Sequence, residues 1–179
     1  MGHIHTEPGQ HDQTISAFIV REDFDKPKLL LHMHKKLHVL LQPGGHIELN
    51  ETPWQAISHE VAEETGYRMD QLQILQPAER LKAISGAVLH PTPLVYNTHY
   101  FDTEGTHRHT DVSYAFVANG EPALELSEDE SSDVRWLSLE ELMALNPNEI
   151  FENVREIGAY TLSTVLNAWE RVDTAEYKG

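Results

Sequence analysis

The stretch from Gly44 to Tyr67, GGHIELNETPWQAISHEVAEETGY, carries the signals that begin and end one helix. Three residues match the preferences of a helix N-terminus, as N-cap, first helical residue and capping-box partner: Thr52, Pro53 and Gln55. Gly66 is placed where helices end. The sequence therefore predicts a helix over about 53–65, with the rest of the chain as a scaffold around it.

This helix is crowded with carboxylates. Glu60, Glu63 and Glu64 stand at i, i+3 and i+4, so they emerge on one side of the helix, about 5–6 Å apart at Cβ. Such like charges repel unless a cation is present. With Glu51 upstream, the segment predicts an oxygen cage for a hard divalent ion, which could promote hydrolysis of a phosphoanhydride. We expect Trp54 and its helical neighbours to pack on a sheet.

The charge balance limits the kinds of partner. The chain has 29 acidic and 13 basic side chains, a formal net charge of -16, which disfavours binding to long nucleic acid. A small anionic substrate remains compatible, because bound divalent ions can invert the local potential. The absence of cysteine excludes disulfides and thiolate sites, and no apolar run is long enough for a membrane span. Without the pattern of a signal peptide, we expect a cytoplasmic protein.

Strands and helices alternate in a mixed order, which favours an α+β or α/β/α layered domain. Predicted strands occupy residues 14–20, 28–32, 36–41, 94–102, 111–118 and 134–137, and residues 72–75 form a short apolar run. Later helices follow Ser138 and span about 151–172. The runs 94–102 and 111–118 could be adjacent antiparallel strands, with 104–110 as a loop. We expect residues 1–12 to be a flexible tail and 13–179 to be a single domain. His3 and His5 could bind a metal, although a frayed terminus is the simpler interpretation.

The spacing in the glutamate segment resembles the Nudix box, a glycine, five residues, a glutamate, seven residues, then Arg-Glu-aliphatic-any-Glu-Glu-any-Gly-aliphatic. The matching positions are Gly45, Glu51, Glu60, Val61, Glu63, Glu64 and Gly66. The resemblance implies a MutT-like fold with a mixed sheet between helices. It also implies Mg²⁺ or Mn²⁺ held by Glu60, Glu63 and Glu64, with Glu51 and the Gly44 carbonyl as further ligands. Glu60 would orient or deprotonate the attacking water, and the substrate would be a nucleoside diphosphate linked to another moiety.

Two positions depart from the box. His59 replaces the arginine that braces the glutamates, and imidazole lacks both the five-donor fork and the permanent charge of guanidinium. Tyr67 replaces the last aliphatic residue, a change that a half-buried aromatic could absorb. We hypothesise that His59 bonds a box carboxylate and makes metal affinity or rate depend on pH. Two alternatives stay open: a neutral His59 bonded to backbone, and a non-catalytic nucleotide-binding or metabolite-binding sensor.

Other candidates lie outside the box. Three loop acids could swing over the site or form a solvated loop: Glu128, Asp129 and Glu130. Three histidines could contact phosphate or a base, or be ordinary loop residues: His99, His107 and His109. Three tyrosines could stack on a nucleobase or belong to the core: Tyr96, Tyr100 and Tyr114. A homodimer is possible if the C-terminal helix buries its apolar face against a second subunit rather than within its own domain.

Overall fold

The computed structural model describes residues 7, 9–100, 107–126 and 131–178. Its strands are β1 (His11–Arg21), β2 (Lys28–Met33), β3 (Leu40–Leu41), β4 (Gly44–His46), β5 (Leu72–Gln76), β6 (Val95–Tyr100), β7 (Arg108–Ala118), β8 (Val134–Leu137) and β9 (Glu170–Asp173). Its helices are α1 (Pro53–Thr65), α2 (Leu139–Ala144), α3 (Glu152–Tyr160) and α4 (Leu166–Ala168), with a π-helical turn at Thr161–Val165 and 3-10 turns at Met69–Gln71 and Thr174–Glu176.

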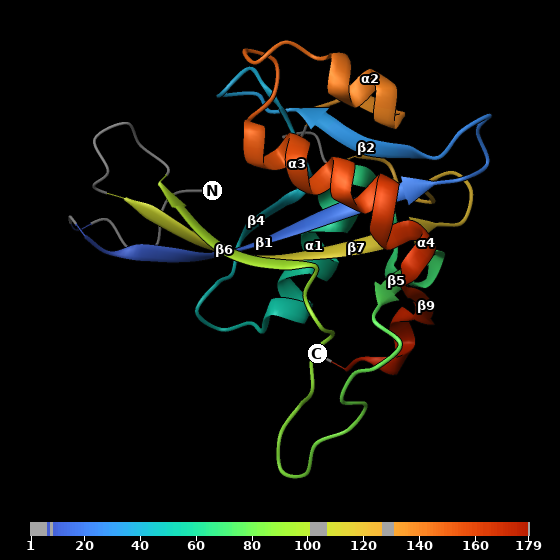
Figure 1. Cartoon of the computed structure of the whole chain (residues 1–179). Helices are drawn as coiled ribbons and strands as arrows, with labels where there is room; N and C mark the ends of the chain where they lie inside the picture. The colour runs from blue at the N-terminus through green and yellow to red at the C-terminus, as the bar shows by residue number, and fades with distance from the viewer. Residues whose placement is uncertain (1–6, 8, 101–106, 127–130, 179) are drawn as a thin grey trace.

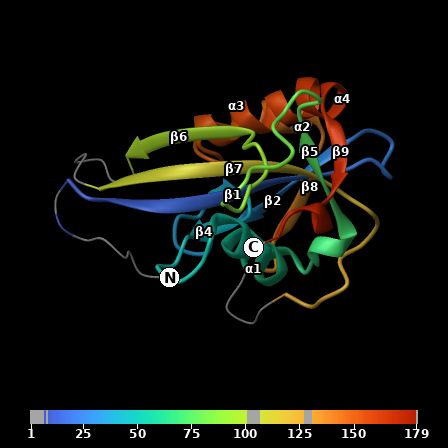
Figure 2. The ribbon, with the colours of Figure 1, turned by 90° about the horizontal axis from the view of Figure 1, so that it is seen from below.

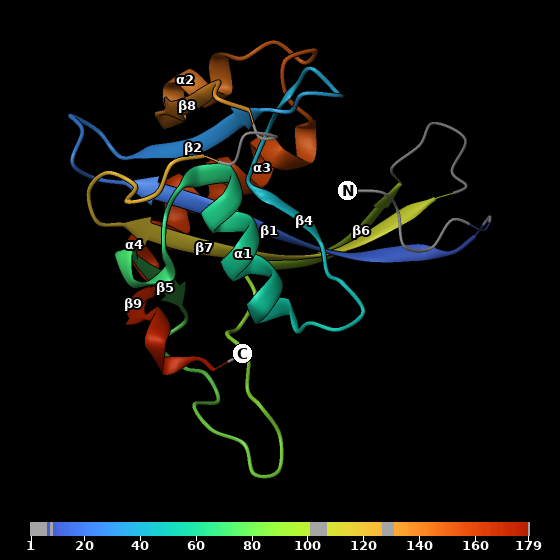
Figure 3. The same cartoon turned by 180° about the vertical axis from the view of Figure 1, so that it is seen from behind.

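The strands join in one mixed sheet whose order is β3-β2-β1-β7-β5-β9 within the described residues, while β4, β6 and β8 pair beside this path. The long strands β1 and β7 are parallel neighbours, with Ile15 opposite Val112, and the other pairs are antiparallel. Helix α1 covers one face and α3 the other (Figures 1, 2 and 3). The predicted α+β architecture, with a sheet between helices, is confirmed.

The two faces of the sheet follow from strand alternation, since successive side chains point to opposite sides. On β1, Ile15 and Ala17 belong to the core under α1, while Phe18 and Val20 belong to the core under α3. Both sets are almost completely buried. The stretch 17–20 of this strand is therefore apolar on both faces, as expected for the centre of a covered sheet.

Helix α1 has the predicted bounds and the predicted ends. The Thr52 hydroxyl accepts from the Gln55 amide at 3.3 Å, and the Gln55 side chain accepts from the Thr52 amide at 2.8 Å. Gly66 closes the helix with φ 73°, a conformation that favours glycine. Trp54, Ile57 and Val61 are buried in the core beneath it.

Several predicted boundaries were wrong. The strand expected over 36–41 is reduced to Leu40–Leu41, because residues 35–37 form a turn. Strand β7 begins at Arg108, within the predicted loop, because pairing with β1 and β6 extends it. Strand β1 begins at His11, inside the segment expected to be a tail.

The C-terminal helix was also predicted too long. The last α-helix ends at Ala168, and residues 170–173 form β9, which pairs antiparallel with β5. This pairing supplies hydrogen bonds to an edge of β5. The hydrophobic pattern of residues 170–173 alone does not predict it. The apolar face of α3 and the following turn, including Val154 and Val165, packs inside the domain. That face is therefore covered without a second subunit.

Among the described residues, no helix is both long enough and apolar enough to cross a membrane.

Candidate active site

The glycine turn places β4 directly against the glutamates of α1. Gly45 lies opposite Ile15 of β1, on the face that α1 covers. A Cβ atom on Gly45 would overlap the Glu60 carboxylate. The missing side chain therefore allows the backbone of β4 to pack against Glu60.

Gly44 fixes a second carboxylate. Its amide donates to Glu64 Oε2 at 2.8 Å. Its φ is 150°, and a Cβ atom there would overlap the Ile15 carbonyl. The two glycines thus allow β4 to lie close to Glu60 and Glu64, which are one helical turn apart on α1.

The three helix glutamates are not equivalent. Glu60 and Glu64 are 5% and 8% exposed, whereas Glu63 is exposed to solvent. The pair at i and i+4 turns towards the glycine turn, and Glu63 borders the open side. The sequence predicted one shared sector, but not this division between buried and accessible carboxylates.

His59 contacts two of the carboxylates. Its Nδ1 lies 3.0 Å from Glu51 Oε2, and its Nε2 lies 3.3 Å from Glu60 Oε1. The other oxygen of Glu51 accepts from the Glu48 amide at 2.8 Å. His59 therefore lies within ion-pair distance of two box carboxylates, while its bracing role and its effect on pH dependence stay predictions.

His32 is a residue of this site that sequence reasoning missed. Its Nε2 lies 3.6 Å from Glu64 Oε2 across the space between β2 and α1. Burial lowers the pKa of His32 to about 4, so the imidazole is neutral at neutral pH. No local motif marks this histidine, because the contact arises from sheet pairing.

The donor set suits a hard divalent cation. Burying carboxylates such as Glu60 and Glu64 is costly unless positive charge or hydrogen bonds compensate it. Glu51, Glu60 and Glu64 are linked through His59 and the glycine turn, and Glu63 offers an accessible oxygen nearby on the helix. Carboxylate oxygens in this number fit Mg²⁺ or Mn²⁺, with water completing the coordination.

Other predicted residues have different positions. The loop acids Glu128, Asp129 and Glu130 lie outside the described residues. Tyr114 is 2% exposed and belongs to the core, while Tyr96 and Tyr100 are exposed on β6. Tyr67 is completely buried rather than half-buried, and its hydroxyl donates to the Gly120 carbonyl at 2.7 Å.

The histidines His99, His107 and His109 gather where β6 and β7 meet. His109 lies opposite Asp12 of β1. Alternation places Asp12 and His109 on the face of Phe18 and Ala115, which α3 covers further along the same strands. The glutamates of α1 therefore lie on the opposite face of the sheet from this pair.

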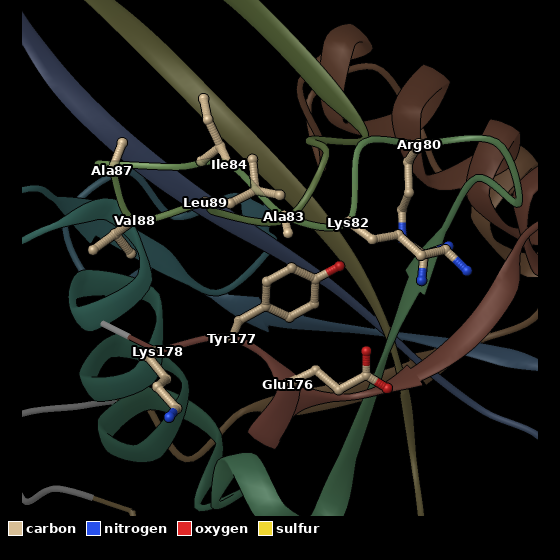
Figure 4. Close-up of a pocket in the computed structure, with 10 residues that line it drawn as sticks. All are labelled: Arg80, Lys82, Ala83, Ile84, Ala87, Val88, Leu89, Glu176, Tyr177 and Lys178. Atoms are coloured by element: carbon tan, nitrogen blue, oxygen red, sulfur yellow. The ribbon is translucent and has the colours of Figure 1, made fainter.

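A cavity of about 320 Å³ lies apart from the glutamates. It is lined by Arg80, Lys82, Ala83, Ile84, Ala87, Val88, Leu89, Glu176, Tyr177 and Lys178. Figure 4 shows the Tyr177 ring between the 82–89 segment and Glu176. Its lining includes no glutamate of α1, so the cavity and the glutamate site are separate features.

Comparison with known proteins gives concordant matches. A family model described as the NUDIX domain matches residues 11–157. A MutT-like protein from Streptomyces ambofaciens is 27% identical over 162 residues, covering 90% of this chain and 81% of that protein. The structure of a NUDIX-family hydrolase from Clostridium perfringens is 31% identical, with a TM-score of 0.69 over 84% of this chain and 95% of that one.

More distant solved structures share the fold. An Ap4A hydrolase from C. elegans is 19% identical, with a TM-score of 0.55 over 84% of this chain and 92% of that one. The NUDIX domain of Shewanella oneidensis NrtR, solved in complex with ADP ribose, is 18% identical, with a TM-score of 0.58 over 84% of this chain and 86% of that one.

Proposed function

The chain belongs to the Nudix family and is a Nudix pyrophosphohydrolase, and from this premise we propose its reaction and its site. It hydrolyses a diphosphate bond in a nucleoside diphosphate linked to another moiety, with Mg²⁺ or Mn²⁺ as cofactor. The observation that carries the proposal is the contact of the glycine turn with Glu60 and Glu64 on the inner side of α1.

Glu60, Glu63 and Glu64 would hold the metal ion, with Glu51 and the Gly44 carbonyl as further ligands. Such an ion, when bound, neutralises charge on phosphate oxygens and acidifies water. Glu60 orients the attacking water and accepts its proton. The water oxygen forms a bond to one phosphorus, the bridging P–O bond breaks, and the second phosphate leaves with the bridging oxygen.

His59 acts as the positioning residue in place of the box arginine. It contacts Glu51 and Glu60 together, which fixes their relative orientation without the fork of a guanidinium. The sensor alternative depended on the loss of this brace. Because His59 makes both contacts, that argument for a non-catalytic module loses its basis.

The substrate should be sought among nucleotide-like diphosphates. Structural neighbours include an Ap4A hydrolase and a NUDIX domain bound to ADP ribose, which motivates a panel rather than one compound. The panel comprises nucleoside triphosphates, dinucleoside polyphosphates, ADP-ribose, NAD and nucleotide sugars, each with and without Mg²⁺ or Mn²⁺. We expect metal-dependent release of a nucleoside monophosphate or of phosphate from at least one member.

The site is tested with Glu63→Gln and Glu64→Gln, which remove one negative charge each with little change of shape. Both should reduce turnover at least about a hundredfold, since catalytic groups of this kind contribute on that scale. Glu156→Gln, an exposed glutamate on α3, is the matched control and should retain full activity. Unchanged turnover in both site variants would refute the assignment.

The loop acids are tested in the same assay by Gln or Asn substitution of Glu128, Asp129 and Glu130. A homodimer is also retained as a proposal, although the apolar face of α3 is buried within the domain. Light scattering coupled to size-exclusion chromatography at several protein concentrations distinguishes the monomer from the dimer.

A further inference from the structure

A second group of metal-ligating side chains lies away from the glutamates. It comprises Asp12 of β1, His46 of β4, His107, and His109 of β7, which we call the Asp–His cluster. Gly45 and His46 are adjacent on β4, so their side-chain directions are opposite. Gly45 faces Glu60, and His46 instead meets Asp12. In Figure 1 the paired ends of β1, β6 and β7 project beyond the helices.

The side chains of the cluster converge on one carboxylate. Asp12 Oδ2 lies 3.4 Å from His46 Nε2 and 3.2 Å from His107 Nε2. Ligand atoms of Asp12, His107 and His109 all lie within 4.8 Å of one another. Around a tetrahedral Zn²⁺ with bonds of about 2.0–2.1 Å, neighbouring ligand atoms are about 3.3 Å apart. The two contacts to Asp12 are close to that spacing.

The rings of the cluster also pack closely. The His109 ring centroid is 5.1 Å from that of His46 and 5.3 Å from that of His107, with interplanar angles of 82° and 88°. The His109 ring therefore packs at nearly a right angle against each of the two imidazoles that contact Asp12. Imidazole and carboxylate together are a donor set that suits Zn²⁺ better than Mg²⁺, which prefers oxygen ligands.

Their partners distinguish Asp12 from a second buried carboxylate on the same face, Asp111. Asp12 is completely buried, as is most of Asp111 two positions further along the same face. Asp111 accepts from the hydroxyls of Thr14, Ser16 and Ser113 at 3.0, 2.8 and 2.7 Å. Asp111 is thus surrounded by hydroxyl donors, whereas Asp12 is contacted by histidines, which can also ligate a metal.

We propose that the Asp–His cluster binds a borderline divalent transition-metal ion, Zn²⁺ in the first instance, with Asp12, His107 and His109 as ligands and His46 beside Asp12. Three protein ligands leave the fourth position of a tetrahedral ion open to water. The ion joins β1 and the start of β7, two segments that are distant in sequence. This site is independent of the hydrolytic one, and it does not require the proposed reaction to be correct.

The test uses the full chain with His3 and His5 changed to Gln in every sample, which removes the N-terminal histidines from the measurement. After removal of metal, the protein is titrated with Co²⁺ and with Zn²⁺ in excess Mg²⁺, which competes weakly for imidazole. We expect one Co²⁺ per chain with the visible spectrum of a tetrahedral site, displacement by Zn²⁺, and a higher melting temperature with Zn²⁺.

Variants decide between a metal site and an ion-paired cluster. His107→Gln, at a partly exposed position, and Asp12→Asn should each weaken Zn²⁺ binding at least about tenfold and remove the rise in melting temperature. Glu63→Gln is the control for the hydrolytic site and should leave the tetrahedral spectrum unchanged. Absence of a tetrahedral spectrum, or unchanged Zn²⁺ affinity in folded His107→Gln, would overturn the proposal. Circular dichroism verifies folding of each variant.

Discussion

Nδ1 of His59 lies 3.0 Å from Oε2 of Glu51, so an imidazole on α1 contacts the glutamate that precedes the helix. The other ring nitrogen lies 3.3 Å from Glu60 Oε1. A group that orients metal ligands in this way contributes to metal affinity without touching the metal. His59 can therefore serve a bracing role even though it has fewer donors than arginine.

We predict that His59→Ala lowers the affinity for Mn²⁺ about tenfold and lowers kcat/KM with it, because both carboxylates lose a shared contact. His59→Arg should retain affinity within about threefold of the wild type, since guanidinium can contact both carboxylates. Isothermal titration with Mn²⁺ measures the affinity, and Ser58→Ala on the same helix is the control. Equal Mn²⁺ affinity in His59→Ala and wild type would show that the contact is without consequence.

We predict that Gly45→Ala damages the site through a steric effect. The added methyl group would occupy space taken by the Glu60 carboxylate, so Glu60 must rotate away. A displacement of about 1 Å at such a group can cost about a hundredfold in rate. Turnover at saturating metal measures this loss.

The control for that substitution is Gly86→Ala. Gly86 has φ 77°, but a Cβ atom added there would have nothing within 4 Å, so its substitution strains the loop without filling a site. It should leave turnover near the wild-type value. A Gly45→Ala enzyme as active as Gly86→Ala would contradict the role given to the glycine turn.

We predict that ionisation of Tyr67 contributes to the loss of stability at alkaline pH. Burial raises the pKa of Tyr67 to about 12, above the value of about 10 for an unfolded tyrosine. The unfolded state then releases the proton first, so this contribution to stability is full below pH 10 and is lost as pH rises towards 12. Tyr67→Phe should cost about 1 kcal/mol at pH 7, through its hydrogen bond, and lose stability less steeply above pH 10.

Urea unfolding at a series of pH values measures this difference. Tyr114 remains in the variant, and burial raises the pKa of Tyr114 to about 12 as well, so the slope should decrease rather than vanish. Tyr96→Phe, at a position 63% exposed, is the control and should follow the wild type. Parallel curves for Tyr67→Phe and wild type above pH 10 would disprove the prediction.

We predict that Arg155 stabilises the fold without affecting catalysis. Its Nη1 donates to the carbonyls of Leu142, Met143 and Leu145 at 3.1, 3.4 and 2.9 Å, around the C-terminal end of α2. Arg155→Met keeps apolar volume but removes these donors, and we expect a loss of about 2–3 kcal/mol. Chemical denaturation measures the change, and turnover per folded molecule should be unaffected.

The matched control is Arg135→Met. Arg135 is partly exposed and pairs with the exposed Asp133, so its loss should change the free energy of unfolding by less than about 1 kcal/mol. If the two variants lose equal stability, the three carbonyl contacts of Arg155 do not have the predicted value.

The sequence predicted an element correctly where neighbouring residues alone specify both of its ends. Helix α1 matches its predicted bounds because Thr52, Gln55 and Gly66 specify both ends by short-range contacts. The last helix was predicted too long because β9 depends on pairing with β5, which lies far earlier in the chain. The start of β7 was missed for the same reason, since polar residues 108–110 look like a loop until β1 and β6 flank them.

The sequence by itself determined the glutamate segment: its helix, its glycine turn and the spacing that names the family are all properties of neighbouring residues. Only the tertiary structure decided that Glu60 and Glu64 turn inward, that His32 approaches Glu64, and that Asp12 meets histidines from β4 and β7. Helical spacing is fixed by backbone hydrogen bonds over four residues, whereas strand neighbours are selected by burial over the whole chain.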